Sequence, residues 1–264
     1  MFWAVRDRAR DELPDGLGVW MLDQLMRIPD IDSLGGNLEW HIGEVLKRVG
    51  LAPLSWLPRA LARRREMEVE RGRGGVRALS HHTRLSRFVA SIEQDGEITP
   101  GDVTAVGALL EFVSDTGSVG YYIPGILRDV DPHGRVVPQE VARRFAEADE
   151  HDARWRLARI GGAFALGSAA WRTIARPVLE QAAAADTTKE RRSLYSALSG
   201  DGPRSWTGSP GEVPGIFTAA VDSARERLEA EADGVFRPFW EWRLTVAEAE
   251  LRDQEEHAKE ERGE

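Results

Sequence analysis

The chain has no cysteine among its 264 residues. This absence excludes disulfide bonds, cysteine nucleophiles and zinc sites built on thiolates, and it fits a reducing cytoplasm. No apolar run approaches the ~20 residues that a membrane-spanning helix needs. The first residues, MFWAVRDRARDEL, carry arginine and aspartate where a signal peptide requires an apolar segment. We therefore expect a cytoplasmic protein that has no membrane partner.

Sequence motifs that mark catalytic sites are missing as well. The chain contains no G-x-S-x-G elbow, no H-E-x-x-H zinc motif, no P-loop lysine motif and no G-x-G-x-x-G after a strand. These absences favour a non-enzymatic protein, and no resident cofactor is predicted. An enzyme of an unrecognised type stays open as a third class.

What the sequence does contain is a series of short amphipathic helices. Apolar residues recur at steps of three and four, which places them on one face of an α-helix. One such set is Val103, Val106, Leu110 and Val113. A single helix cannot bury such a face alone, so these helices must stack on their neighbours. The sequence predicts an all-α fold of stacked antiparallel helix pairs, either as an α-solenoid or as an irregular helical array.

Breaks in the helical pattern predict how the chain is divided. We expect N-terminal helices over 1–70, a linker over 71–79, central helices over 80–199, and a loop with two helices and an acidic tail over 200–264. The last helix loses its apolar face beyond Leu251. Its end is therefore expected to project into solvent or to receive a partner.

Helix boundaries in the central part follow from caps and breakers. Ser168 is expected to be an N-cap, and Pro138 to lie at the start of a helix. The remaining helices are expected over 100–115, 119–128, 150–165, 168–183 and 188–199.

Helix pairs recur at roughly 40-residue spacing, as in α-solenoids. The pattern is carried by SHHTRLSRF (80–88), GSVGYYIPGILRDVDPHG (117–134) and LGSAAWRTIARPVLEQA (166–182), about a sixth of the chain. These stretches resemble the HEAT-like repeat regions found near the C-termini of large bacterial NTPase and defence-type proteins. The resemblance implies a scaffold that presents a concave surface to a second protein or to another part of a longer polypeptide.

One internal repeat has an offset of 38 residues, because EQDGEITPGDV (93–103) aligns with DPHGRVVPQEV (131–141). The repeat resembles the calcium loop of EF-hand proteins, in which a glycine makes the sharp turn and oxygen ligands occupy fixed positions. The resemblance implies calcium loops at 91–102 and 129–140. In the second loop the ligands would be Asp129, Asp131, His133 and Glu140, and the first loop offers Ser91, Glu93, Asp95 and Asp102.

A pair of capped turns explains the same repeat without a metal. A turn glycine, one buried Ile or Val and a helix begun by proline form a common arrangement between helices. Thr99 and Asp102 fit a capping box at the start of such a helix. His133 also places a nitrogen where Ca²⁺ prefers oxygen. Both interpretations stay open, and a calcium-binding protein is the alternative function.

The charge distribution and one tryptophan in a predicted loop indicate what kind of partner the protein binds. The formal net charge of −9 argues against general affinity for nucleic acid. Nine arginines and only three glutamates lie between Arg59 and Arg87, which is either a solvated helix face or a patch for an acidic partner. Trp206 lies in the Gly/Pro-rich segment 199–215, where an aromatic residue suits an interface. We expect a protein partner or another domain of a longer chain, contacted through Trp206, Arg63, Arg64 and Arg65.

Overall fold

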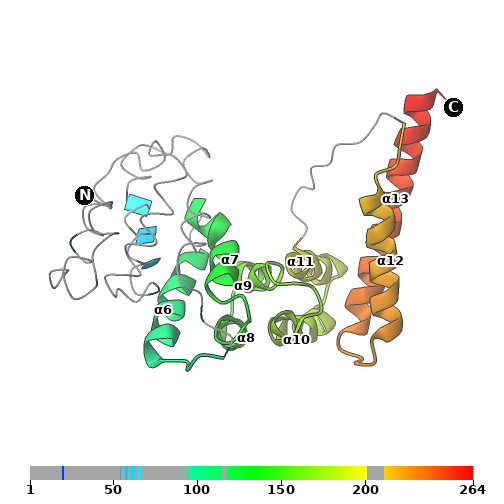
Figure 1. Cartoon of the computed structure of the whole chain (residues 1–264). Coiled ribbons are helices and arrows are strands. Elements are labelled where there is room, and N and C mark those ends of the chain that lie inside the picture. The colour runs from blue at the N-terminus through cyan, green and yellow to red at the C-terminus, as the bar shows by residue number, and fades with distance from the viewer. Residues whose placement is uncertain are drawn as a thin grey trace. The chain divides into compact units, whose positions relative to one another are not determined.

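The computed structural model describes residues 95–114, 118–200 and 211–263 (Figure 1). It also describes Trp20, Ile92 and seven helical positions between 54 and 66. Every regular element in this part of the chain is a helix, so the predicted all-α class is confirmed. The predicted linker at 71–79 lies outside the described residues.

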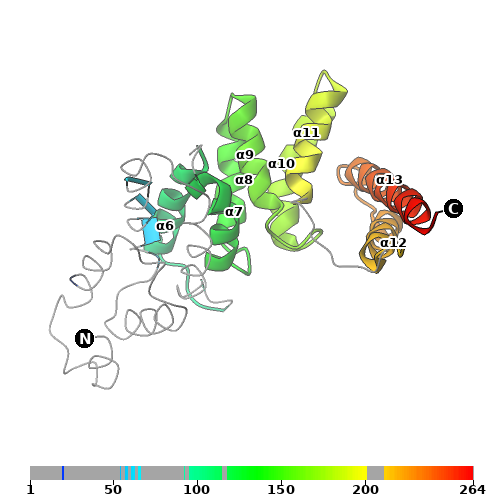
Figure 2. The same cartoon turned by 90° about the horizontal axis from the view of Figure 1, so that it is seen from above.

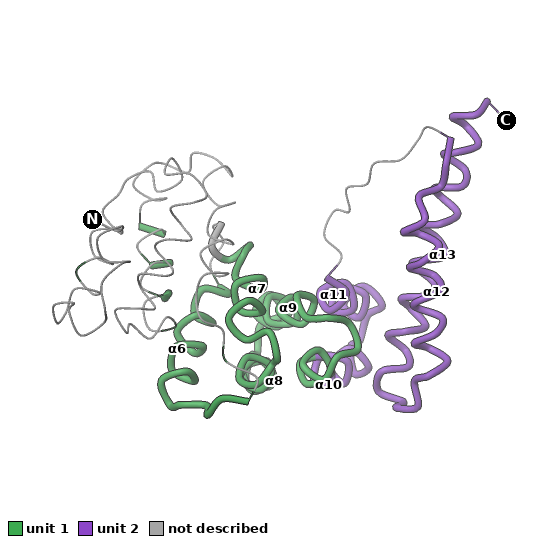
Figure 3. The backbone as a smooth tube through the Cα atoms, viewed as in Figure 1, with its two compact units in different colours: residues 1–174 green, residues 175–264 purple. Residues whose placement is uncertain are grey.

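The chain divides into two compact units, residues 1–174 and 175–264 (Figure 3). The division falls inside helix α10 (Ala169–Ala184), three residues before Pro177. Proline has no backbone N–H and its ring clashes with the carbonyl four residues earlier, so it interrupts helical hydrogen bonding. No helix that the structure describes is both long enough and apolar enough to span a membrane.

The first unit is built from short helices that share one apolar core. Helix α6 (Pro100–Leu110) leads into a 3₁₀ turn, η4 (Glu111–Ser114), and is followed by α7 (Ser118–Val130), α8 (Val137–Glu147) and α9 (His151–Gly161). Each α-helix begins at or next to its predicted position. The side chains with no exposed surface include Val106, Leu109, Leu127, Val130, Val137, Val141, Ile160 and Trp171.

Local side-chain caps explain where two of these helices begin. The Thr99 hydroxyl accepts the backbone N–H of Asp102 (3.2 Å), and the Asp102 carboxylate accepts that of Thr99 (2.9 Å), so the predicted capping box is confirmed. At α10, the Ser168 hydroxyl accepts the backbone N–H of Trp171 (3.2 Å), which confirms the predicted N-cap. Such caps satisfy N–H groups that have no partner within the helix.

The second unit contains α11 (Thr188–Ser199), α12 (Gly215–Ala230) and α13 (Arg237–Arg262). Helices α12 and α13 run antiparallel and side by side (Figures 1 and 2). Aromatic rings form much of the core of this unit: Phe236, Phe239 and Trp240 are buried, and the Tyr195 ring lies 5.7 Å from that of Phe239. Apolar area removed from water is therefore the main stabilising term here, as in the first unit.

The end of α13 is held by the segment that precedes α12. Gly211 donates its N–H to the Glu261 carboxylate and accepts a hydrogen bond from Arg262 (2.6 Å). One turn earlier, Ala258 is only 3% exposed. Most residues of α13 beyond Leu251 are exposed, as expected from the loss of the apolar face, and Ala258 is the buried exception among them, close to Gly211.

Candidate binding surface

An exposed aromatic side chain marks the surface of the first unit. Tyr121 of α7 is 58% exposed, the largest value among the exposed large hydrophobic residues that the structure describes. Its ring meets that of Tyr122 edge-on, with 4.9 Å between centroids. The guanidinium carbon of Arg159, on α9, lies 5.6 Å from the Tyr121 centroid and 5.1 Å from that of Trp155. We call Tyr121, Tyr122, Trp155 and Arg159 the aromatic–arginine cluster.

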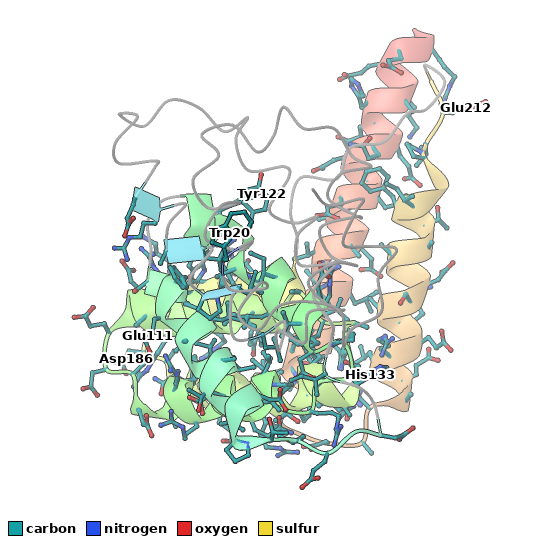
Figure 4. All side chains as sticks on the ribbon, turned by 60° about the vertical axis from the view of Figure 1, so that its left-hand side comes forward. Trp20, Glu111, Tyr122, His133, Asp186 and Glu212 are labelled. Carbon is teal, nitrogen blue, oxygen red and sulfur yellow. The ribbon has the colours of Figure 1, made fainter. Side chains whose placement is uncertain are left out.

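Helical spacing explains why these side chains gather. Trp155 and Arg159 are four residues apart on α9 and therefore share one face of that helix. The buried residues of α9 are Leu157, Ala158, Ile160 and Gly161, which occupy other positions on the helix. Tyr122, marked in Figure 4, is half-buried, as are Trp155 and Arg159. The cluster therefore lies at the boundary between the core and the solvent, with the Tyr121 ring outermost.

The positive charge of Arg159 is not neutralised within the described part of the chain. Its side chain stacks on two rings and forms neither an ion pair nor a hydrogen bond to an oxygen of any described residue. Asp152 is the carboxylate on the same face of α9, and seven residues place it ~10 Å away along the axis. Arg154 and Arg156 donate to backbone carbonyls, at 2.8 and 3.1 Å. Helix α9 carries three arginines against one aspartate, so its own side chains are net positive.

Asp131, a predicted calcium ligand, caps a helix instead. Its carboxylate is fully buried and accepts three backbone N–H groups: from Arg135 (2.8 Å), Val136 (2.8 Å) and Val137 (2.7 Å). Val136 is the N-cap residue of α8 but has no side-chain acceptor, and Pro138 has no N–H to satisfy. Asp131 thus supplies, from outside the helix, the acceptor that the N-cap position lacks.

Asp129 and Glu140, two further predicted ligands, are paired with arginines. The Asp129 carboxylate lies 2.7 Å from Arg128, and that of Glu140 lies 2.6 Å from Arg143 and 3.0 Å from Arg144. The hydrogen bond from Arg143 is the main cause that lowers the pKa of Glu140, and Arg144 lowers it further against the opposing effect of burial. Both carboxylates are thus engaged with side chains of their own helices.

His133, the fourth predicted ligand, is exposed (Figure 4). Among the described residues, no three His, Asp or Glu side chains are arranged to hold a metal ion. The second loop keeps its four candidate ligands close in sequence, but three of them already have other partners. Calcium binding at 129–140 therefore rests on the sequence pattern alone.

The two copies of the repeat contact each other. The Ile92 N–H donates to the Val130 carbonyl (2.8 Å), and these residues occupy equivalent positions in the repeat. The Arg135 guanidinium donates to the Gly96 carbonyl (2.6 Å). In the first loop, Asp102 belongs to the capping box and Asp95 is exposed, whereas Ser91 and Glu93 lie outside the described residues. The repeat thus pairs two turns that each lead into a helix.

The interaction residues predicted from the sequence lie largely beyond the structure. Trp206, Arg63 and Arg64 fall outside the described residues, whereas Arg65 occupies an exposed helical position. Their role stays a prediction. The aromatic–arginine cluster was not predicted. The Trp155–Arg159 spacing could have indicated half of it, but nothing in the sequence indicates that Tyr121 meets them.

Comparison with protein-family models, with curated proteins and with solved structures finds no match for this chain. The HEAT-like and EF-hand resemblances therefore stay predictions from the sequence. The function has to be argued from the residues themselves, and the aromatic–arginine cluster is the surface on which that argument rests.

Proposed function

We propose that this chain is a non-enzymatic interaction module that works in the cytoplasm and binds another protein through the aromatic–arginine cluster. The observation that carries the proposal is the 58% exposed ring of Tyr121, held against Arg159 beside Trp155. Tyrosine, tryptophan and arginine are the residue types that contribute most binding energy at protein interfaces. All three residue types meet here on the surface of the first compact unit.

The cluster contributes little to holding the two helices together. A cation–π contact at an exposed site is worth about 0.5–1 kcal/mol. By contrast, fully burying a Leu or Ile side chain is worth about 1.5–3 kcal/mol, and Leu127 of α7 and Ile160 of α9 have no exposed surface. Removing the cluster should therefore leave the fold intact, which makes its role in binding separable from its role in packing.

The geometry also reduces the cost of binding. A free arginine side chain loses rotamer freedom when a partner fixes it, which costs about 0.5–1.5 kcal/mol for such a side chain. Arg159 is already restrained between two rings, and both rings are carried by helices. Residues held by rigid elements in this way are positioned more accurately than residues on loops.

Co-purification tests this function. Tagged wild-type chain and the Tyr121→Ala/Arg159→Gln variant would be expressed in the cells from which the chain comes, and recovered proteins would be compared by quantitative mass spectrometry. We expect at least one protein whose recovery falls tenfold or more with the variant, because tenfold corresponds to ~1.4 kcal/mol and two hot-spot side chains are lost. Chemical denaturation should show that the variant loses no more than ~2 kcal/mol of stability.

Arg225→Gln is the matched control for charge. Arg225 is 49% exposed on α12 and pairs with Asp222 and Glu248 at 3.5 and 3.6 Å, so its replacement changes the net charge equally. The control should recover the same proteins as wild type. The proposed function would be contradicted if wild type, the Arg225→Gln control and the folded double variant all recovered the same proteins in the same amounts.

A further inference from the structure

We infer that the aromatic–arginine cluster recognises an acidic segment of its partner protein, a stretch in which an Asp or Glu lies next to an apolar or aromatic residue. This inference rests on the proposed function and specifies the chemistry of the partner. It is carried by the charge and the free hydrogen-bonding capacity of Arg159.

The guanidinium of Arg159 has N–H donors that no oxygen of a described residue accepts. A guanidinium carries five N–H donors in a fixed plane that matches the two oxygens of a carboxylate. In Arg159 no described residue supplies an oxygen to any of these donors, and its contacts are to the Tyr121 and Trp155 rings. Ring contacts leave the charge uncompensated. A carboxylate of a partner would supply both the acceptors and the opposite charge.

The surroundings of Arg159 favour the same ligand. Three arginines and one aspartate lie within α9, so the helix that carries Arg159 is itself net positive. The guanidinium carbon of Arg159 lies 5.1 and 5.6 Å from the Trp155 and Tyr121 ring centroids, and the side chain is half-buried, so its attraction to an anion is less weakened by water than that of a fully exposed arginine. The chain as a whole has a net charge of −9, so attraction to an anion is confined to local surfaces such as this one. A local cationic surface of this kind favours an acidic segment that docks on it.

The exposed ring indicates what lies beside the carboxylate. Tyr121 is 58% exposed and has Tyr122 at its edge, 4.9 Å away. An apolar or aromatic side chain packed on this ring would remove its surface from water while the neighbouring Asp or Glu meets Arg159. A phosphate of nucleic acid offers similar charge, but the net charge of −9 on the chain disfavours a polyanion. An acidic protein segment therefore fits these observations better.

Selection from a random 12-residue phage-displayed peptide library on the immobilised full chain tests the inference. Wild type, Arg159→Gln, Tyr121→Ala and the charge-matched control Arg225→Gln would be panned in parallel and the selected peptides sequenced. We expect at least a threefold enrichment of Asp or Glu beside an apolar residue with wild type and Arg225→Gln. The best synthetic peptide should bind Arg159→Gln at least tenfold more weakly, because the carboxylate loses its charged partner.

Three other results would overturn the inference, the proposed function or both. Enriched neutral peptides that require Tyr121 but bind Arg159→Gln normally would overturn the acidic inference and leave the proposed function standing. Selection that is the same for wild type and Tyr121→Ala, with that variant folded by circular dichroism, would overturn both. A twelve-nucleotide oligo(dT) that binds more tightly than the best peptide and requires Arg159 would assign the surface to nucleic acid and overturn the inference of a protein partner.

Discussion

Replacing Asp131 with alanine should lower the free energy of unfolding by about 3–5 kcal/mol, because three backbone N–H groups at the start of α8 lose a charged acceptor. Two of these groups belong to the buried residues Val136 and Val137, so water cannot replace the carboxylate without opening the turn. Chemical denaturation followed by circular dichroism at 222 nm measures the change.

The matched control for this substitution is Asp149→Ala. Asp149 is exposed between α8 and α9, and its replacement should change stability by no more than about 0.5 kcal/mol. Equal denaturation midpoints for the two variants would show that Asp131 does not cap α8. Asp131→Asn keeps one carbonyl oxygen but faces an NH₂ group toward backbone donors, so it should fall between wild type and Asp131→Ala.

Replacing Gly134 with alanine should destabilise the protein by about 2–5 kcal/mol, for two separate reasons. Gly134 has a φ of 66°, in the left-handed region that other residues adopt only with strain. A Cβ at this position would also lie 2.3 Å from the Ala170 Cβ and 3.1 Å from the Pro138 Cγ. The start of α10 would have to move, and denaturation midpoints would report the cost.

Two further variants separate these causes. Gly125→Ala meets nothing within 4 Å and lies inside α7, so it should be neutral or stabilise by up to ~1 kcal/mol. In an Ala170→Gly background the steric part of the Gly134→Ala cost should fall by about 1 kcal/mol or more, since the nearest clashing atom is gone. A Gly134→Ala variant as stable as wild type would contradict the close approach of this turn to α10.

Helix starts could be predicted from the sequence because their causes are local. The capping box of Thr99 and Asp102 and the cap of Ser168 each involve residues three apart, so the pattern is visible in a short window. Apolar spacing fixed the fold class for the same reason. One expected helix end, at 165, was wrong: the helix ends at Gly161 with Gly162 as its C-cap, and glycine is a residue type that commonly ends helices.

Contacts between distant segments could not be predicted. Asp131 lies five residues before Val136 and six before Val137, whose N–H groups it accepts. Sequence patterns look for a cap at the N-cap position itself, so they do not identify Asp131. The hydrogen bond between Gly211 and Arg262 joins residues 51 apart, and nearby Ala258 is buried although no apolar periodicity marks it. The aromatic–arginine cluster likewise depends on how α7 packs on α9. The candidate site is therefore a product of packing rather than of a motif.

Photo-crosslinking from position 121 tests the central claim, that this surface binds another protein. p-Benzoylphenylalanine would replace Tyr121 in the full chain inside its own cells. In two control chains it would replace Val103 or Ile216, which are also exposed (44% and 43%, against 58% for Tyr121). We expect irradiation to give a discrete crosslinked protein from position 121 at a yield at least several-fold above both controls. Equal yields from all three positions, or none from position 121, would contradict a binding role for the aromatic–arginine cluster.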